Sequence, residues 1–460
     1  MKAHKAWNYS PFKPLFFDTG DIYICRVAPE ATSISFDWLP IDAAEYEIYI
    51  REKDEGVFSL AGKTDECSYT IENLAKHCDY EFYVCAGNNK SRVRLARCGD
   101  HVGTIINYLH PEDDVYNFSG HALCSPDILR HPDGFLLASM DLFTVTHPQN
   151  LTLIYRSDDD GKTWKYVTEL FPAFWTKMFI HKGELYALAC STEYGDLLIG
   201  KSTDGGANWT EPTVLFRGLN GKNGSTGVHK NPQPVVSFDG RLWNTLEWGS
   251  WGEYYHAVMV MSADENSDLL DAGSWSFSDP VKYDPNWEGT AKGRSAGNIE
   301  GCLAVLDGKL YNIMRYDMTQ TIPNYGTILA YEVDTKNPEA PLSYAFPIDF
   351  IGNQSKFEIK YHEGTQKYYS IICRITDGTN PRMRNLLSLM VSEDGRNWRL
   401  AKDIYNYLHA NPGKVGFQYV DFFFEGDEIL FQCRTAMNNA TNFHDSNYAT
   451  FDRISLKDLD

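Results

Sequence analysis

Six positions recur at the same place in a repeated segment, and the last three of them are arginines, which suit an acidic ligand. Each segment begins with a tight turn, such as Asp307-Gly308, and continues with an apolar run that predicts a buried strand. The residues that close these runs are, in chain order, Asp141, Cys190 with Ser191, Glu247, Arg315, Arg374 and Arg434. A guanidinium is a planar fork that binds a carboxylate through two hydrogen bonds. Three arginines at equivalent positions therefore predict a site for a carboxylate.

A second set of candidates lies just before the same segments. These residues are His121, Lys177, His229 with Lys230, Glu300, Lys356 and Tyr419, joined by His444 near the end of the chain. If all the turns lie on one face of the protein, both sets lie together on the opposite face. We expect the catalytic residues to be His121, Asp141, Glu247 and Tyr419. We expect the ligand to contact His229, Lys230, Glu300, Arg315, Lys356, Arg374, Arg434 and His444.

His121 is the strongest candidate for proton transfer. An unperturbed imidazole titrates near ~6.5, which suits acid–base chemistry at neutral pH. We predict that it faces the mouth of a central channel near Asp141, Tyr419 and His444. Two alternatives stay open: His121 is a structural residue held against the 441–448 loop, and the Asp141/Glu247 pair supplies the carboxylates of a hydrolase. Arginines at strand ends are also often solvated or link neighbouring sheets.

The repeat itself indicates the architecture. Its six turns, at residues 131–134, 182–183, 238–240, 306–308, 361–364 and 425–426, are 49 to 68 residues apart. That spacing is typical of the four-stranded blades of a β-propeller. We therefore predict an all-β propeller over residues 105–460, with six blades by repeat count. A seventh blade within the 240–308 gap is also compatible with the pattern, and residues 105–108 would complete the last blade.

A second motif alternates with the first. Its copies are Ser157-Asp-Asp-Asp-Gly-Lys-Thr-Trp164, Ser202-Thr-Asp-Gly-Gly-Ala-Asn-Trp209 and Ser392-Glu-Asp-Gly-Arg-Asn-Trp398. These segments resemble the Asp-boxes of sialidase-like propellers. That resemblance implies a structural role, in which the Ser and Asp close a hairpin and the Trp packs between blades.

The chain before the propeller predicts two further segments. Residues 33–38, 46–50 and 80–84 alternate between apolar and polar like half-buried strands separated by short turns, which is typical of a β-sandwich. Trp38 and the segment Leu74-Ala-Lys-His-Cys-Asp-Tyr80 resemble the core tryptophan and the tyrosine corner of fibronectin type III domains. We therefore predict an N-terminal segment over 1–21 and a fibronectin type III-like domain over 22–104.

Charge and cysteine usage exclude several classes of function. The net charge of −20 argues against nucleic acid or an anionic membrane as a partner. No apolar run is long enough to span a bilayer. The ten cysteines include no Cys-x-x-Cys pair and no Cys/His cluster with zinc spacing, so we expect no metal and no cofactor. We expect a cytoplasmic location, or secretion if a signal peptide has been removed. The oligomeric state stays open.

The propeller resembles one enzyme family along its whole length. The matching segments are Gly120-His-Ala, Ser125-Pro-Asp127, Ala138-Ser-Met-Asp141, His229-Lys-Asn-Pro-Gln-Pro234, Gly240-Arg-Leu-Trp243, Glu300-Gly301, Ser355-Lys-Phe357, Gly416-Phe-Gln-Tyr-Val-Asp421 and Phe443-His-Asp-Ser-Asn-Tyr448. They are similar to ulvan-type polysaccharide lyases and rhamnosyl-glucuronate-cleaving enzymes. His121 matches a histidine that the lyases keep. Met140, Val228 and Asn244 stand where those lyases have a second histidine, a tyrosine and an arginine. Ser125 stands where sialidases have the arginine of Arg-Ile-Pro.

These observations predict an enzyme that cleaves a glycosidic bond in an acidic oligosaccharide containing uronate and rhamnose. β-Elimination needs a base and a neutralised carboxylate, whereas hydrolysis needs a pair of acid–base groups. His121 would serve either reaction, and Lys230, Arg315 or Arg434 would neutralise the carboxylate. Two alternatives remain: an exo-sialidase-type hydrolase, and a propeller that binds sugar without cleaving it.

Overall fold

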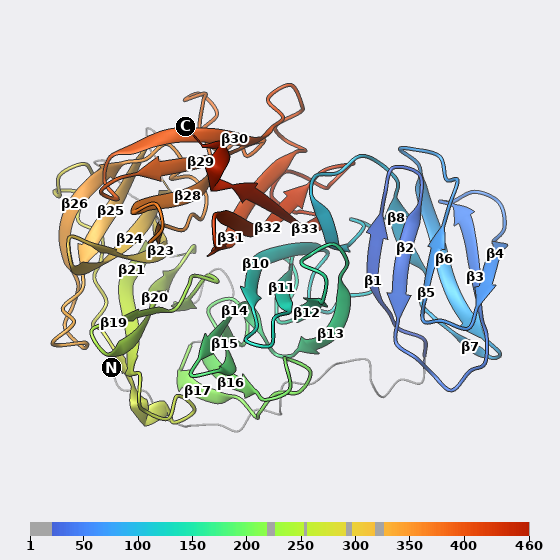
Figure 1. Cartoon of the computed structure of the whole chain (residues 1–460), viewed down its shortest axis with the longest axis horizontal. Helices are drawn as coiled ribbons and strands as arrows, with labels where there is room; N and C mark the ends of the chain where they lie inside the picture. Colours follow the sequence, from blue (N-terminus) through green and yellow to red (C-terminus); the bar gives the residue numbers. More distant parts are fainter. Residues whose placement is uncertain (1–20, 219–225, 253–254, 291–296, 318–325, 460) are drawn as a thin grey trace.

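The computed structural model describes residues 21–459 except 219–225, 253–254, 291–296 and 318–325. It contains an N-terminal β-sandwich and a β-propeller, which lie side by side (Figure 1). The only helical elements in the described chain are two 3-10 turns, η1 (Ala272–Ser274) and η2 (Leu456–Asp458). No helix of the described residues is long and apolar enough to cross a membrane. The predicted all-β class is confirmed.

The sandwich consists of two antiparallel sheets. Its first sheet has the order β1-β2-β5, and its second has the order β4-β3-β6-β7, with β8 pairing β6. The strands are β1 (Ile24–Pro29), β2 (Ile34–Trp38), β3 (Tyr46–Glu52), β4 (Ser59–Thr64), β5 (Ser68–Ile71), β6 (Asp79–Ala86), β7 (Asn89–Lys90) and β8 (Arg94–Arg97). Trp38 is buried against Phe36 and Tyr46. The Tyr80 hydroxyl accepts a hydrogen bond from the Ala75 N–H at 2.8 Å, which closes the predicted corner.

The propeller has six sheets among the described residues, one for each repeat. Blade 1 comprises β10 (Ala122–Arg130), β11 (Leu136–Phe143), β12 (Thr152–Ser157) and β13 (Lys165–Leu170). Blade 2 comprises β14 (Phe174–His181), β15 (Glu184–Cys190), β16 (Leu197–Ser202) and β17 (Thr213–Phe216). Blade 3 comprises β18 (Gly227–His229), β19 (Val236–Phe238), β20 (Arg241–Ser250), β21 (Tyr255–Asp264) and β22 (Trp275–Phe277).

Blade 4 comprises β23 (Gly297–Leu306), β24 (Lys309–Asp317), β25 (Thr327–Glu332) and β26 (Ser343–Asp349). Blade 5 comprises β27 (Lys360–His362), β28 (Lys367–Cys373), β29 (Leu386–Ser392) and β30 (Trp398–Asn406). Blade 6 comprises β31 (Gly416–Glu425), β32 (Glu428–Ala436), β33 (Tyr448–Ser455) and β9 (Thr104–Tyr108). The long 240–308 interval holds the ten-residue hairpin strands β20 and β21 and the loops after them, and no further sheet lies among its described residues.

The first propeller strand in the chain closes the ring. β9 pairs antiparallel with β33, so that Tyr108 lies opposite Tyr448. Residues from the start and the end of the propeller therefore share one sheet, as residues 105–108 were predicted to do. The repeated turns join the first and second strands of each blade, and the Ser-x-Asp motifs join the third and fourth strands of blades 1, 2 and 5. Both sets of turns lie on one face, so the second-strand ends lie on the other.

The Ser-x-Asp turns hold themselves by local hydrogen bonds. In blade 1 the Ser157 hydroxyl accepts from the Gly161 N–H at 2.8 Å, and Asp159 Oδ1 accepts from the Thr163 N–H at 2.9 Å. Trp164 is buried against Phe451 of blade 6, with ring centroids 5.6 Å apart. A polar turn and a large apolar side chain therefore fix the outer hairpin to the neighbouring blade.

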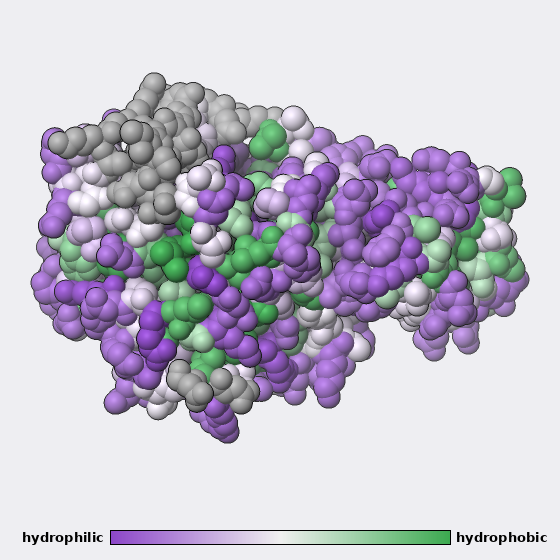
Figure 2. All heavy atoms as spheres, turned by 90° about the horizontal axis from the view of Figure 1, so that it is seen from above, coloured by the Kyte–Doolittle hydropathy of each residue, from purple (hydrophilic) through white to green (hydrophobic). Residues whose placement is uncertain are grey.

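Burial along the strands explains why the inner runs are almost continuously apolar. β11 and β15 are buried over nearly their whole length, because both faces of a blade pack on neighbouring blades. The outer strands β26 and β30 are mostly exposed or half-buried, with one buried residue in each. The visible surface is accordingly mostly hydrophilic, with scattered apolar groups (Figure 2), in keeping with the acidic composition.

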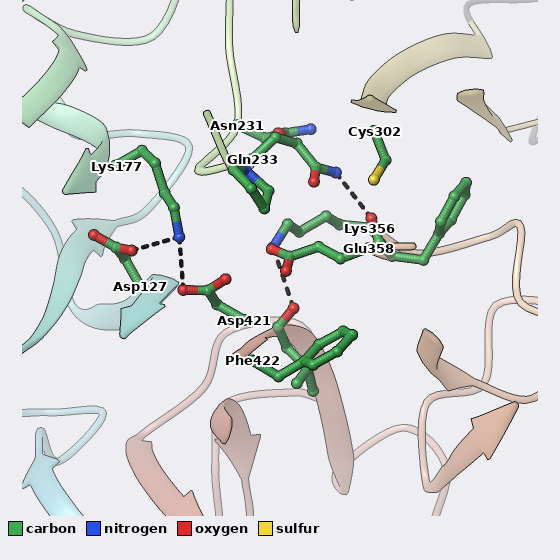
Figure 3. Close-up of polar contacts among 12 residues, drawn as sticks. Asp127, Lys177, Asn231, Gln233, Cys302, Lys356, Glu358, Asp421 and Phe422 are labelled. Carbon is green, nitrogen blue, oxygen red and sulfur yellow. Dashed lines mark hydrogen bonds and ion pairs between the residues drawn. The ribbon is translucent and has the colours of Figure 1, made fainter. Parts of the chain in front are cut away.

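A buried network of charges joins the blades around the propeller axis (Figure 3). The Lys177 ammonium of blade 2 lies 2.7 Å from Asp127 of blade 1 and 2.7 Å from Asp421 of blade 6. From blade 5, Lys356 pairs with Glu358 at 2.5 Å, and Lys360 lies 2.9 Å from Glu358. Three carboxylates therefore face three ammonium groups, and the network is neutral overall.

Ionisation of this network is stabilised by its own geometry. Burial by itself would lower the pKa of Lys177, but Asp127 and Asp421 raise it well above its ordinary value. Burial would likewise raise the pKa of Asp421, but Lys177, Lys360 and Lys356 hold it well below its ordinary value. Removal of one member would leave its partners charged and desolvated.

The sandwich is fixed to the propeller by polar contacts at and beside its strands β1 and β8. Arg94 pairs with Asp113 at 2.7 Å, with both side chains buried. The Arg26 guanidinium donates to the backbone carbonyls of Ile106 at 2.9 Å and Ile105 at 3.0 Å, which belong to β9. The Tyr23 and Tyr116 hydroxyls are 2.6 Å apart. The two domains therefore share a buried, hydrogen-bonded interface.

We predict that Lys177→Met lowers the free energy of unfolding by roughly 3–5 kcal/mol, because Asp127 and Asp421 lose a shared buried counter-ion. Lys309→Met is the matched control, since Lys309 pairs with Glu332 at 2.9 Å on the surface, with 56% and 40% of the two side chains exposed. That control should cost less than about 1 kcal/mol. Urea unfolding measures both changes, and equal losses would show that the central network does not stabilise the ring.

Candidate functional site

A cavity of about 270 Å³ opens on the face where the second strands end. Its wall includes side chains from all six blades, among them four arginines and two glutamates. The lining residues are Cys124, Ser125, Phe143, Val145, Phe174, Trp175, Glu193, His229, Trp251, Glu300, Arg315, Arg382, Arg384, Tyr419, Arg434 and His444. A positive cavity in a chain of net charge −20 stands out, because local charge rather than total charge attracts a ligand.

Four lining residues sit in β-bulges of inner strands. Ser125, Trp175, Glu300 and Tyr419 have φ angles of 49°, 53°, 56° and 56°, and each lies at a register shift in its strand pair. A left-handed backbone at a non-glycine residue costs on the order of 1–3 kcal/mol. A bulge re-aims a side chain relative to its strand. The four bulges therefore turn these side chains into the cavity, at the cost of backbone strain.

Gly301 permits the bulge beside Glu300. A Cβ at Gly301 would lie 2.3 Å from Asn312 Oδ1 and 2.5 Å from Met314 Sδ, so that only glycine fits there. The Gly301 N–H also donates to Glu247 Oε1 at 3.2 Å. A close backbone approach in blade 4 therefore holds the backbone beside Glu300 in place.

Tyr419 and Glu300 form the centre of the cavity. The Tyr419 hydroxyl donates a short hydrogen bond to Glu300 Oε1 and accepts one from Arg315 Nη1 at 3.2 Å, while Arg315 also pairs with Glu300 Oε2. Burial would raise the pKa of Glu300, but Arg315 and the Tyr419 hydroxyl hold it below its ordinary value. Burial and Glu300 raise the pKa of Tyr419 well above its ordinary value. The pair is therefore a neutral phenol hydrogen-bonded to an ionised carboxylate.

Arg384 and Arg434 flank the same tyrosine without an acidic partner. Their guanidinium carbons lie 5.8 Å and 5.1 Å from the Tyr419 ring centroid. Arg384 donates to the Gln418 side-chain oxygen and, at 3.2 Å, to the Gln354 carbonyl, and Arg434 donates to the His444 carbonyl. Neither has a carboxylate within ion-pair distance among the described residues.

The isolation of these two guanidiniums is unfavourable without a ligand. Arg384 is 3% exposed and Arg434 4%, and their Nε–H groups have no partner within the described chain. Burial, together with the neighbouring Arg315 and Arg434, lowers the pKa of Arg384 to about 10 against the opposing effect of Tyr419. A buried cation without a counter-ion carries a large desolvation cost. An anionic group bound in the cavity would offset that cost.

The opposite side of the cavity carries His229 and Glu193. His229 Nδ1 lies 2.7 Å from Glu247 Oε2, which directs the other ring nitrogen away from Glu247. Trp175 packs on the imidazole, with ring centroids 4.5 Å apart. Glu193, in the loop after β15, is 9% exposed, and burial raises its pKa to about 7.

Six of the twelve residues predicted from the sequence line the cavity: His229, Glu300, Arg315, Tyr419, Arg434 and His444. They come from blades 3, 4 and 6, which the repeat brings to one face. His444 lies beside Arg434, and its Nδ1 contacts Asp445 at 2.9 Å. Burial and Arg434 lower its pKa to about 3, so the imidazole is neutral.

His121 does not line the cavity, and its predicted position at the channel mouth is wrong. Its Nδ1 lies 3.1 Å from the backbone carbonyl of Asp113, and its ring packs against His147 with centroids 4.7 Å apart. Asp113 is the residue that pairs with Arg94 of the sandwich. His121 therefore has local partners near the domain interface. This is a structural role, as in the alternative above, but the partners are Asp113 and His147 and not the 441–448 loop.

Asp141 and Glu247 lie behind the wall rather than in it. Asp141 accepts hydrogen bonds from Thr152 Oγ1 at 2.5 Å and from the Trp175 N–H at 2.6 Å, and burial raises its pKa to about 7. Glu247 holds His229 and the Gly301 N–H. Neither carboxylate of the Asp141/Glu247 pair, the hydrolytic alternative from the sequence, therefore lines the cavity, and both groups position lining residues instead.

Two predicted lysines are buried away from the cavity. Lys356 belongs to the central charge network, and Lys230 donates to the carbonyls of Trp175 at 3.2 Å and Asn231 at 3.0 Å. Burial lowers the pKa of Lys230 to about 8. Both predictions of ligand contact are corrected, because these side chains are already occupied by internal partners.

Arg374 lies outside the cavity, because it stands one residue after the strand position that Arg315 and Arg434 occupy in their blades. Arg315 and Arg434 pair with the residues just before Glu300 and Tyr419, whereas Cys373 closes the second strand of blade 5. Side chains alternate along a strand, so the next residue points the other way. Arg374 accordingly pairs with Asp403 of β30 at 2.8 Å, and its predicted place beside the other two arginines is wrong.

The sequence patterns missed several lining residues. Arg384 precedes β29, the third strand of blade 5, and third strands begin on the same face as second strands end. Extending the repeat to that position would have found it. Glu193 and Trp251 lie in loops that differ in length between blades, and Trp175 is an aromatic residue inside an apolar run, so none of these three carries a sequence signal.

Comparisons with known proteins support the architecture. Residues 24–95 match the model of the fibronectin type III domain. No curated protein sequence matches the chain. Among solved structures, the α-L-arabinanase of Penicillium chrysogenum complexed with arabinobiose has a TM-score of 0.51 and 16% identity, over 78% of this chain and 99% of that chain. The α-L-arabinofuranosidase of Fusarium graminearum with an iminosugar inhibitor has a TM-score of 0.53 and 15% identity, with the same coverage.

The leech intramolecular trans-sialidase complexed with 2,7-anhydro-Neu5Ac is similar over more of the chain. Its TM-score is 0.51 at 9% identity, and the alignment covers 97% of this chain and 93% of that chain. At such identities the likeness concerns the fold. It agrees with the all-β architecture described above.

Proposed function

We propose that the protein is a glycoside hydrolase that removes a terminal sugar bearing a carboxylate. The observation that carries the proposal is the surrounding of Tyr419. Its hydroxyl is hydrogen-bonded to Glu300 and Arg315, and the ring is flanked by Arg384 and Arg434, which lack an acidic partner. A carboxylate-bearing sugar would supply the missing anion and place its anomeric carbon near the phenol.

The arrangement suits a two-step displacement. Tyr419 Oη attacks the anomeric carbon while Glu300 accepts the phenolic proton, and the bond to the leaving oxygen breaks as that oxygen gains a proton from a general acid. Water then displaces the tyrosine from the same carbon and gives up a proton to the same group, and Glu300 returns the first proton to the phenolate. Two inversions retain the configuration of the sugar. The Tyr419 hydroxyl needs Glu300 as its base, since the raised pKa of Tyr419 keeps the free enzyme's phenol neutral.

The neutral charge of the tyrosine nucleophile favours a substrate whose carboxylate is attached to the anomeric carbon. If the substrate carries its carboxylate on the anomeric carbon, as sialic acids do, an attacking carboxylate would meet like charge beside the reacting atom. A phenol avoids that repulsion, and sialidases use a tyrosine nucleophile. The sialidase-type alternative from the sequence is therefore favoured over a uronate linked to rhamnose, although Ser125 stands in place of the sialidase arginine.

The structural neighbours support cleavage of a glycosidic bond. These neighbours are an arabinanase, an arabinofuranosidase and a trans-sialidase. Elimination would instead require a base beside an acidified C–H bond. In this cavity the tyrosine donates its proton to a carboxylate, which suits attack by the phenolic oxygen on the anomeric carbon. A hydrolase releases a saturated sugar with retained configuration. A lyase would release an unsaturated uronate absorbing in the near ultraviolet, and a binding protein would release nothing.

Arg384→Gln should weaken binding of a carboxylate-bearing sugar. We expect N-acetylneuraminate or glucuronate to raise the melting temperature of the wild type. At a ligand concentration of 100 times the dissociation constant, binding should add about 2.7 kcal/mol to the free energy of unfolding. Glucose at equal ionic strength should not. The variant should lose most of the gain, whereas Arg374→Gln should keep it, because Arg374 pairs with Asp403 outside the cavity. Equal gains in both variants would contradict the carboxylate site.

Tyr419→Phe should lower kcat by roughly 10³-fold or more, because the nucleophile is lost while the arginines remain. The test uses 4-methylumbelliferyl glycosides of N-acetylneuraminic acid and of glucuronic acid, with proton NMR to follow the configuration of the first product. Tyr361→Phe is the control, since Tyr361 is 40% exposed on another surface. Inverted product, or full activity in Tyr419→Phe, would refute the tyrosine mechanism.

A further inference from the structure

Glu193 is a second carboxylate in the cavity, and the mechanism above does not use it. It lies three residues after β15 of blade 2, on the side of the cavity formed with His229 and Trp251. It is 9% exposed, and within the described chain its carboxyl has no hydrogen-bond or ion-pair partner. A buried carboxyl without a partner is unfavourable unless it is protonated or serves a ligand.

The reaction needs a proton donor that Tyr419 and Glu300 do not supply. The departing oxygen of a sugar leaving group is a strong base, so bond cleavage requires its protonation. Glu300 is ionised and paired with Arg315, and the four arginines of the cavity stay protonated. His444 is neutral and contacts Asp445, and His229 is held through Nδ1, which lies 2.7 Å from Glu247 Oε2. Glu193 is the remaining carboxyl of the lining, and it is not held by an internal partner within the described chain.

We infer that Glu193 is the general acid and base of the reaction. This inference rests on the proposed hydrolysis. In the first step Glu193 gives its proton to the leaving oxygen as the bond to the anomeric carbon breaks. In the second step the Glu193 carboxylate accepts a proton from the attacking water, and Tyr419 leaves as its phenolate takes a proton from Glu300. Both residues return to their starting states, and the net change is addition of one water across the glycosidic bond.

The placement of charge agrees with this division of roles. Arg315, Arg384 and Arg434 come from blades 4, 5 and 6, whereas Glu193 comes from blade 2 and lies in the electrostatic range of His229 of blade 3. The acidic sugar would therefore lie toward the arginines, and its leaving group toward Glu193 and Trp251. Burial keeps Glu193 half protonated at a pH of about 7, so that it can both donate and accept a proton near neutrality.

The test compares leaving groups in Glu193→Gln. For a methyl glycoside, whose leaving group needs a proton, we expect kcat/KM to fall by roughly 10²–10⁴-fold. For the 4-methylumbelliferyl glycoside of the same sugar, whose leaving group departs without one, the fall in the first step should be less than about tenfold. In the wild type, kcat/KM for the methyl glycoside should decrease above a pH of about 7, and the variant should lack this decrease.

Glu184→Gln is the matched control, because Glu184 lies on β15 of the same blade and pairs with Lys201 at the surface. It should leave both rates unchanged. A melting-temperature readout is independent of activity. The folded-state pKa of Glu193 is raised, so its contribution to stability is present at low pH and is lost as pH rises through about 7. Glu193→Gln should therefore gain in melting temperature relative to the wild type as pH rises.

The outcomes separate the two proposals. If the wild type cleaves none of the glycosides, the proposed function fails. If the wild type is active and Glu193→Gln loses equal activity on both leaving groups, or loses none on the methyl glycoside, the assignment of Glu193 is overturned while the hydrolase proposal stands.

Discussion

The ion pairs of Lys177 with Asp127 and Asp421 are the contact on which the propeller depends most. They join blades 2, 1 and 6 at 2.7 Å, at the place where the ring closes on itself. Neighbouring blades pack through apolar faces. Because apolar packing is not directional, it favours one orientation of a blade relative to its neighbours only weakly. A charge buried at the axis permits a single arrangement, because any other leaves it unpaired. The cost of desolvation thus becomes a source of specificity.

The same bulges that build the network also build the site. In blades 1, 2, 4 and 6 the residue with positive φ enters the cavity, and the residue two positions later faces the axis below it. These pairs are Ser125 and Asp127, Trp175 and Lys177, Glu300 and Cys302, and Tyr419 and Asp421. The backbone strain of each bulge is therefore offset by packing at the axis. The backbone at Tyr419 and Glu300 cannot return to an extended conformation without moving Asp421 and Cys302, which keeps the reacting groups preorganised.

Much of this arrangement could be predicted from the repeat, and the failures have physical reasons. Turn spacing and apolar runs indicated six blades, the closing strand β9 and the face on which Arg315, Arg434 and Glu300 lie. The prediction for Arg374 failed because the turn of blade 5 is longer, and one residue of slip reverses the direction of a side chain. The roles of Asp141 and Glu247 depended on burial, which spacing does not reveal. Glu193 lies in a loop without periodicity, so only the folded chain brings it to the site.

The position of His121 connects the sandwich to the cavity rim. Asp113 receives Arg94 of the sandwich on its carboxylate and contacts His121 Nδ1 through its carbonyl. The His121 N–H donates to the carbonyl of Phe143 at 3.2 Å, and Phe143 lines the cavity and packs against His444. A short chain of contacts therefore runs from a buried interdomain ion pair to the edge of the site. The fibronectin type III-like domain acts as a brace for blade 1 in this arrangement, because a flexible tether would need no buried ion pair at its base. That role also accounts for the histidine at this position without giving it any part in proton transfer.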